Sequence, residues 1–173
     1  MTARTRHLGG WAVLLVAALV CGAGAWSYGQ ARGDGSLAHA KARDTALGEG
    51  RRHLATLNSL DGADAKRVDT GLRAWLDAST GPLRDQLERT READAKSLTA
   101  AGDTARGKVA SAALTALDER TGTAELIAAV DVEVTPRSGA AGTQRKRFGA
   151  TLARTADGWK VKALTAIGTD GGR

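Results

Sequence analysis

The sequence predicts an α+β fold in which an N-terminal transmembrane helix precedes three helices packed on a four-stranded antiparallel sheet. Three observations lead to this prediction. An uncharged run occupies residues 8–31, apolar residues then recur at helical spacing as far as residue 101, and from residue 108 they alternate with polar residues as in strands. Because the helices precede the strands, we expect an antiparallel meander with the helices on one side.

This pattern divides the chain into five segments. They are a cytoplasmic N-terminus at residues 1–7, a transmembrane helix at 8–31, a juxtamembrane segment with the first helix at 32–60, the remainder of an extracytoplasmic domain at 61–168, and a disordered tail at 169–173. The part beyond the span has the size of one ordinary domain.

The uncharged run is long enough to cross a membrane. At ~1.5 Å per helical residue, residues 8–31 span about 36 Å, against ~30 Å for the hydrocarbon core of a bilayer. Arg4 and Arg6 precede the run and favour a cytoplasmic N-terminus with the domain outside. The alternative is a signal peptide cleaved near Ala25, after which the domain is secreted. Trp26 favours the uncleaved anchor, because aromatic residues gather at the membrane interface.

Three helices are predicted after the run. The first ends near Leu60 and carries Leu47, Leu54 and Leu57 at helical spacing. The second begins at Asp61, a plausible N-cap, and its apolar face is formed by Val68, Leu72, Trp75 and Leu76.

The third predicted helix follows the break Ser79-Thr80-Gly81-Pro82, since proline is tolerated in a first turn. Its buried side is marked by Leu83, Leu87 and Leu98, and Gly102 is a C-terminal stop.

Four strands are predicted at residues 108–117, 123–135, 144–155 and 159–167. The second has the clearest alternation, with an apolar face of Leu126, Ala128, Val130, Val132 and Val134. Ala156-Asp157-Gly158 predicts the tight turn before the last strand. In that strand the alternation directs Trp159, Val161, Ala163 and Ile167 inward, with Lys160 and Lys162 outward.

Few aromatic residues are available to the domain. Trp75, Phe148 and Trp159 are candidates to line a pocket between the helices and the sheet, although packing in an alanine-rich core is the more common use of such residues.

The basic charge is concentrated near the C-terminus. The formal net charge is +6, and residues 136–173 carry this whole excess through eight cations and two carboxylates. The candidate docking face comprises Arg145, Lys146, Arg147, Lys160 and Lys162. Outside the membrane, such a face suits lipid headgroups or an acidic protein better than nucleic acid; the alternative is a solvated strand face.

No catalytic, metal-binding or cofactor-binding pattern occurs in the sequence. The three histidines, His7, His39 and His53, all precede the predicted strands, and no P-loop, H-E-x-x-H or G-x-S-x-G motif is found. We therefore predict no catalytic residues, no metal and no cofactor, and a protein that is not an enzyme.

Three segments carry a family resemblance: LATLNSLD (54–61), STGPLRDQ (79–86) and RFGATLARTADGWKVKAL (147–164). With the N-terminal span, they resemble the Mce-associated membrane proteins of actinobacteria. The extracytoplasmic domain of that family is NTF2-like, with a cystatin-like fold, and is similar to conjugation proteins of the VirB8 class. The resemblance implies the same domain here and an accessory role beside an Mce lipid importer.

Three functions follow as hypotheses. The first is a non-enzymatic, membrane-anchored accessory subunit of a transport complex, in contact with the membrane and with other subunits. The second is a lipid-binding or small-ligand-binding module. The third is a VirB8-like scaffold of a conjugation or secretion apparatus, in which oligomerisation is possible.

Overall fold

The computed structural model describes residues 36–168. The predicted N-terminus (1–7), span (8–31) and tail (169–173) lie outside these residues, so the anchor and its orientation stay predictions. Within the described part, no helix has the length and apolarity needed to cross a membrane. The chain divides into two compact units after Lys41, and the description below concerns the second unit.

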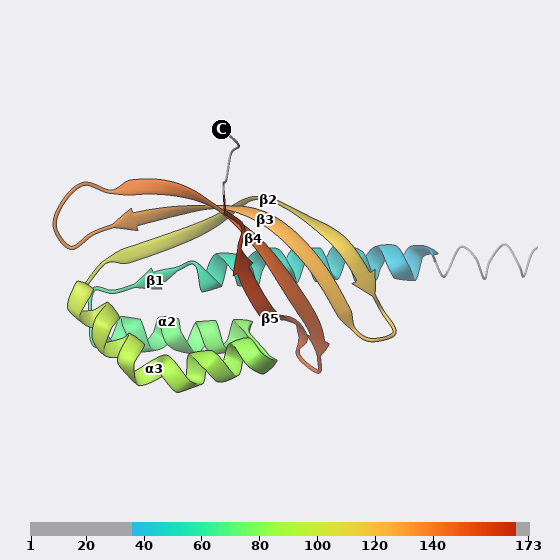
Figure 1. Cartoon of the computed structure of the whole chain (residues 1–173), viewed down its shortest axis with the longest axis horizontal. Coiled ribbons are helices and arrows are strands. Elements are labelled where there is room, and N and C mark those ends of the chain that lie inside the picture. The colour runs from blue at the N-terminus through green and yellow to red at the C-terminus, as the bar shows by residue number, and fades with distance from the viewer. Residues whose placement is uncertain (1–35, 169–173) are drawn as a thin grey trace, which may run out of the picture. The chain divides into compact units, whose positions relative to one another are not determined.

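The helices precede the four long strands, so the predicted α+β class is confirmed. A first helix at residues 36–57 leads to the two-residue strand β1 (Leu60–Asp61), then to α2 (Ala65–Ala78) and α3 (Gly81–Ala101). The long strands are β2 (Thr104–Asp118), β3 (Thr123–Thr135), β4 (Gly142–Thr155) and β5 (Gly158–Ala166). They form one antiparallel sheet in the order β1-β2-β3-β4-β5, with the helices on one side (Figure 1).

The sheet has five strands where four were predicted, because β1 was not expected. Leu60 pairs with Ala105, and Asp61 pairs with Thr104. Two residues are too few to give a strand pattern in sequence. The four longer strands lie close to their predicted positions.

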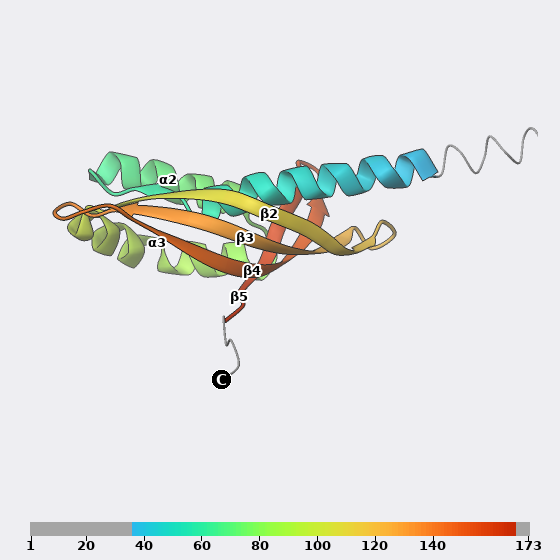
Figure 2. The same ribbon diagram turned by 90° about the horizontal axis from the view of Figure 1, so that it is seen from above.

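The main core lies between the first helix and the inner face of the sheet. Its buried residues are Ala46, Leu54, Ala124, Leu126, Ala128, Val130, Val132, Phe148, Ala150, Leu152, Trp159 and Val161. The alternation predicted for β3 is confirmed, since Leu126 and Val130 are buried while Glu125 is exposed. The first helix runs beside β2 (Figure 2), where a Cβ on Gly107 would stand 2.6 Å from Cβ of Asn58.

A smaller hairpin cluster holds α2 and α3. Its buried residues are Leu60, Val68 and Leu72, with Trp75, Ala95 and Leu98 packed against them. No residue of α3 is buried, so the predicted leucine face of this helix is only half covered. Gly102, in the left-handed region at φ 71°, ends α3 as predicted.

Two local predictions were wrong. The N-cap of α2 is Asp64, whose carboxylate accepts a hydrogen bond from the Arg67 N–H at 2.9 Å, whereas Asp61 belongs to β1. In β5, Ala163 and Ile167 are exposed instead of inward. Thr151 pairs with Ala163 and Leu152 with Val161, so Lys162 is an extra residue that reverses the alternation.

Candidate functional site

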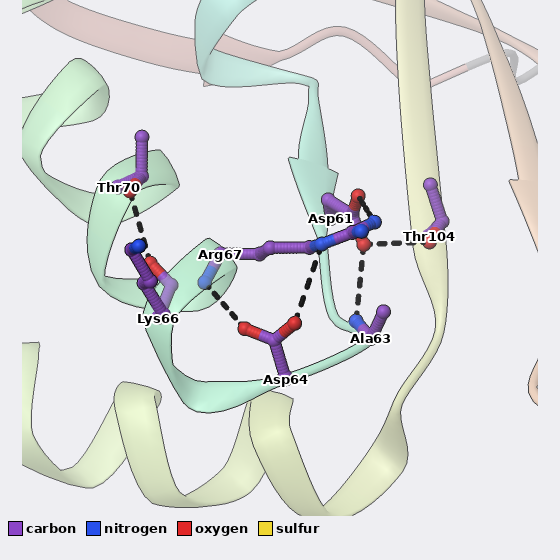
Figure 3. Close-up of polar contacts among 7 residues, drawn as sticks. All are labelled: Asp61, Ala63, Asp64, Lys66, Arg67, Thr70 and Thr104. Carbon is purple, nitrogen blue, oxygen red and sulfur yellow. Dashed lines mark hydrogen bonds and ion pairs between the residues drawn. The ribbon is translucent and has the colours of Figure 1, made fainter.

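A groove opens where β1, the start of α2 and the start of β2 meet (Figure 3). Its volume is about 610 Å³, and it is lined by Ser59, Leu60, Asp61, Asp64, Lys66, Arg67, Thr70, Gly71, Thr104, Ala105 and Arg106. Gly71 lets Leu60 pack closely on α2, because a Cβ at position 71 would stand 2.9 Å from Leu60 Cδ1. The groove therefore has a small-residue and aliphatic floor with a charged rim.

Arg67 joins the two carboxylates of the rim. Its Nη1 donates to Asp61 Oδ2 at 2.8 Å, and its Nε lies 3.3 Å from Asp64 Oδ2. The other oxygen of Asp61 accepts from the Ala63 N–H at 3.0 Å and from the Thr104 hydroxyl at 3.4 Å (Figure 3). Residues from β1, α2 and β2 thus meet in one polar network.

These contacts fix the charge of the network. The Ala63 N–H and then the Arg67 guanidinium lower the pKa of Asp61 below its ordinary value, and Asp61 in turn raises the pKa of Arg67. Asp61 is therefore ionised at neutral pH and is a poor proton donor. The groove is better suited to recognition than to proton transfer.

Two cations at the groove remain available to a ligand. Lys66 and Arg106 form no ion pair with another residue in the range 36–168. Beside the apolar floor, they suit a carboxylate or another anionic group.

The outer face of the sheet, opposite the main core, is a second candidate surface. Ile127 and Ile167 are 47% and 45% exposed. They border a shallow depression of about 320 Å³, lined also by Ser111, Ala112, Ala113, Ala128, Ala129, Arg147 and Phe148. Toward the β3–β4 turn, Arg145 donates to both carboxylate oxygens of Asp131, at 2.6 and 2.9 Å, and this contact lowers the pKa of Asp131.

The three predicted pocket residues do not share one cluster. Trp75 belongs to the hairpin cluster, and its Nε1 donates to the carbonyls of Thr56 and Ser59 at 3.0 and 2.9 Å. Phe148 and Trp159 belong to the main core. Their role in ligand binding stays a prediction.

Trp159 also ties the first helix to the end of the sheet. Its backbone N–H donates to Glu49 Oε2 at 2.6 Å, and Arg154 lies 5.9 Å from the centroid of its ring. One turn further along the helix, burial is the first cause of the lowered pKa of His53, followed by the charge of Arg52. Two polar helix residues therefore face the β4–β5 hairpin.

The five predicted docking cations are distributed over different parts of the sheet. Arg145 and Arg147 lie on the outer face, while Lys146 alternates with them toward the other face. Lys160 is opposite Ala153 in the sheet, and its Nζ lies 3.6 Å from a carboxylate oxygen of Asp157. Ala153 is eight residues along β4 from Arg145, so Lys160 lies about 26 Å from Arg145.

Lys162, the fifth cation, is the extra residue of the β5 irregularity and lies near Gly81. Docking by the five residues stays a prediction, and the geometry divides them into separate groups.

Sequence analysis did not find the groove, because it depends on β1 and on contacts between distant segments. The outer face had a clearer signal in Ile127, an apolar residue on the polar side of a well-defined alternation.

Among the solved structures with a similar backbone are two type IV secretion proteins and an NTF2-like protein. CagV, a VirB8 homologue of the type IV secretion system from Helicobacter pylori, has 10% identity and a TM-score of 0.51; the match covers 68% of this chain and 92% of CagV. An IcmL-like type IV secretion system protein from Legionella pneumophila has 10% identity and a TM-score of 0.52, and the match covers 76% of this chain and 97% of that protein. An NTF2-like protein with a cystatin-like fold from Novosphingobium aromaticivorans has 17% identity and a TM-score of 0.50, and the match covers 80% of this chain and 89% of that protein.

These likenesses show the fold, which is the NTF2-like architecture expected from the sequence and shared with VirB8-type domains. No protein-family model matches the sequence, and the comparison with curated proteins finds no match. Membership of the Mce-associated family therefore stays a prediction.

Proposed function

We propose that the protein is a non-enzymatic assembly subunit that holds a VirB8-like domain on the outer side of a membrane and binds other subunits of a complex there. The groove carries this proposal. Its rim combines an Asp61–Arg67–Asp64 network with the available cations Lys66 and Arg106. These groups favour recognition of a partner segment with an anionic side chain.

The connection between helix and sheet supports the assembly role. The first helix follows the predicted anchor and enters the main core through the fully buried Leu54. Near the helix middle, Glu49 holds the backbone of Trp159. A domain fixed to its leading helix in this way has a defined orientation for binding other subunits.

The complex itself is the finer part of the proposal. CagV and the IcmL-like protein belong to type IV secretion systems by their descriptions, which favours a secretion or conjugation apparatus. The segments 54–61, 79–86 and 147–164 favour an Mce-type lipid importer through their resemblance. Both assignments place the domain outside the membrane.

Capture of partners from cells distinguishes these assignments. The tagged full-length chain is cross-linked in its own cells and purified from membranes, and its partners are identified by mass spectrometry. Permease and Mce subunits support the importer, whereas secretion ATPases and channel subunits support the secretion apparatus. Recovery of neither class contradicts the assembly role, and a bound lipid mass on an otherwise isolated chain favours the lipid-binding alternative.

A matched pair of variants tests the groove. Lys66→Glu reverses an available charge on the rim, and Arg89→Glu makes the same change at an exposed position of α3. We expect Lys66→Glu to reduce partner recovery about tenfold, because an unpaired like charge opposes an anionic partner. Arg89→Glu is expected to leave recovery unchanged. Equal recovery with both variants removes the groove from the proposal.

A further inference from the structure

The sheet has a short open edge at the start of β4. β5 pairs with β4 only from Phe148 onward, and one further bond joins the Ile167 N–H to the Arg147 carbonyl at 2.9 Å. Within the described range 36–168, residues 142–146 pair with β3 on one side and with no strand on the other. Residues 142–147 are all exposed, and Figure 1 shows this end of β3 and β4 extending past the end of β5. The position beyond the end of β5 is therefore open to a further strand.

The bond to Arg147 shows which backbone groups face this open edge. In an antiparallel pair, alternate residues direct their N–H and C=O toward the same neighbouring strand. Thr143 and Arg145 therefore present theirs on the same side as the Arg147 carbonyl. No other segment of residues 36–168 bonds to these four groups. The edge offers two donors and two acceptors in one row.

The opposite edge of the sheet is less suited to strand addition. β2 has two register shifts along its length, between Val109 and Ser111 and between Leu114 and Ala116, and the first helix runs beside it (Figure 2). Such irregularities hinder pairing with another chain. The pairing of β3 with β4 has no shift from position 142 to position 153. The start of β4 is thus both regular and open.

The open edge is basic. Residues 142–147 include Arg145, Lys146 and Arg147 and no carboxylate. Arg145 is bound to Asp131, whereas Lys146 and Arg147 form no ion pair with another residue of the described range. The rows of β2, β3 and β4 that pair at this end of the sheet carry five cations and two carboxylates: Arg106, Lys108, Arg145, Lys146 and Arg147 against Asp131 and Glu133. An acidic segment therefore complements this edge.

We propose that the open edge of β4 binds an extended, acidic segment of a partner subunit, which adds a strand to the sheet antiparallel to β4. Addition of a strand to an exposed sheet edge is a recurrent mode of peptide recognition. The segment continues the line of β5 beyond Ile167 and exchanges four backbone hydrogen bonds with Thr143 and Arg145. One carboxylate of the segment lies opposite Lys146, and a second lies diagonal to Arg147, within reach of both cations.

Charge favours a partner segment over the other possible occupants. Two copies of the chain joined at this edge would bring the three cations of each copy together, and like charges on paired strands are destabilising. Residues 169–173 contain two glycines and have one carboxylate offset by Arg173. This composition is poor in residues that favour strands, so these residues compete weakly for the edge.

Peptide binding to the full-length chain in a non-ionic detergent tests the proposal. The probe is the fluorescein-labelled peptide Glu-Glu-Val-Thr-Val, and its charge control has lysine at both glutamate positions. By fluorescence anisotropy, we expect the acidic peptide to bind about tenfold more tightly. Hydrogen exchange of residues 142–147 is expected to slow in the complex, because the Thr143 and Arg145 N–H groups become bonded. Equal affinity of the two peptides overturns the proposal.

A backbone control separates strand addition from simple charge attraction. N-methylation of the second glutamate and of the threonine keeps the charge of the peptide but removes the two N–H groups that face β4. We expect this peptide to bind about tenfold more weakly than the probe. Unchanged affinity would mean that the backbone is not recognised and would overturn strand addition.

Two variants of the chain locate the binding. Thr143→Pro removes an outward N–H, and proline is tolerated on an edge whose N–H faces solvent; we expect about tenfold weaker binding. Lys146→Glu is expected to reverse the preference, so that the lysine peptide binds more tightly. Arg89→Glu, at an exposed position of α3, is the control and is expected to change nothing. Full affinity in a folded Thr143→Pro variant, or the original preference in Lys146→Glu, contradicts this location.

The result is separable from the proposed function. The groove lies at β1, and the sheet order places β2 and β3 between β1 and β4. Failure of the peptide to bind leaves partner recovery through Lys66 unaffected, because the groove requires no added strand. Conversely, Lys66→Glu is expected to bind the acidic peptide as the unmodified chain does, even where it captures no partner.

Discussion

The main core and the hairpin cluster hold their helices in different ways. The first helix packs on the sheet through fully buried side chains such as Leu54 against Leu126 and Leu152. The hairpin cluster has three buried residues, Leu60 from β1 with Val68 and Leu72 from α2, and α3 contributes none. Polar contacts supply much of the remaining attachment, including Trp75 Nε1 to Thr56 and Ser59 and Arg91 to Asp69.

This difference predicts two levels of stability in one domain. Burial of apolar area supplies most of the free energy of folding, so elements with few buried side chains open at lower cost. We expect the amide protons of α3 to exchange before those of β3. Four substitutions test the contrast, in decreasing order of expected effect.

The largest effect is expected at Leu126 in the main core. Leu126→Ala leaves a cavity beneath the sheet and lowers the free energy of unfolding by about 2–5 kcal/mol. Ile127→Ala, one residue away on the outer face, is expected to cost less than about 1 kcal/mol. Urea unfolding of the two variants measures both values, and similar losses would contradict the assignment of the two faces.

Gly107 tests the seam between the first helix and β2. A Cβ at this position would lie 2.6 Å from Asn58 Cβ and 3.0 Å from the Ala55 carbonyl oxygen. Gly107→Ala is therefore expected to lower stability by about 1–3 kcal/mol. Gly48→Ala is the matched control, because nothing lies within 4 Å of its added Cβ and alanine favours a helix by up to ~1 kcal/mol. Opposite signs of the two changes in melting temperature support the close approach.

Trp75→Phe tests the polar attachment of the hairpin. The substitution keeps a ring but removes the donor to Thr56 and Ser59, and we expect a loss of about 1–2 kcal/mol. Hydrogen exchange is expected to become faster in α2 and α3 than in the sheet. Thr90→Ala, which removes a bond to the Gln86 carbonyl on the exposed side of α3, is expected to have little effect. Uniform acceleration over the whole domain would contradict a separate hairpin.

The smallest effect concerns pH. Arg91 is the first cause of the lowered pKa of Asp69, which links α2 to α3. Because the folded pKa lies below the ordinary value near 3.8, the stabilisation is complete above that value and is lost as pH falls through the folded pKa. In Asp69→Asn this pH-dependent stabilisation is absent. We therefore expect its free energy of unfolding, measured with urea, to fall less between pH 7 and pH 3 than that of the unmodified protein. Asp77→Asn, on an exposed position of the same helix, controls for the lost charge.

Sequence analysis was most successful where the pattern is local. Leu126 to Val132 alternate strictly, so the inner face of β3 was predicted residue by residue and is confirmed. The site was less accessible to prediction. Trp75, Phe148 and Trp159 are all apolar and all at least partly covered, but composition does not reveal that Trp75 packs with a different cluster. The groove depends on the pairing of Leu60 with Ala105, which no local period encodes.

The sequence by itself determined the order of helices and strands, the inner face of β3 and the end of α3 at Gly102. Each depends on spacing or on the backbone freedom of one residue, and these properties act within a few residues of chain. Only the tertiary structure decided the pairing of β1, the N-cap at Asp64 and the irregularity at Lys162. These features depend on register between segments far apart in the chain, and register is set by how side chains pack across the sheet.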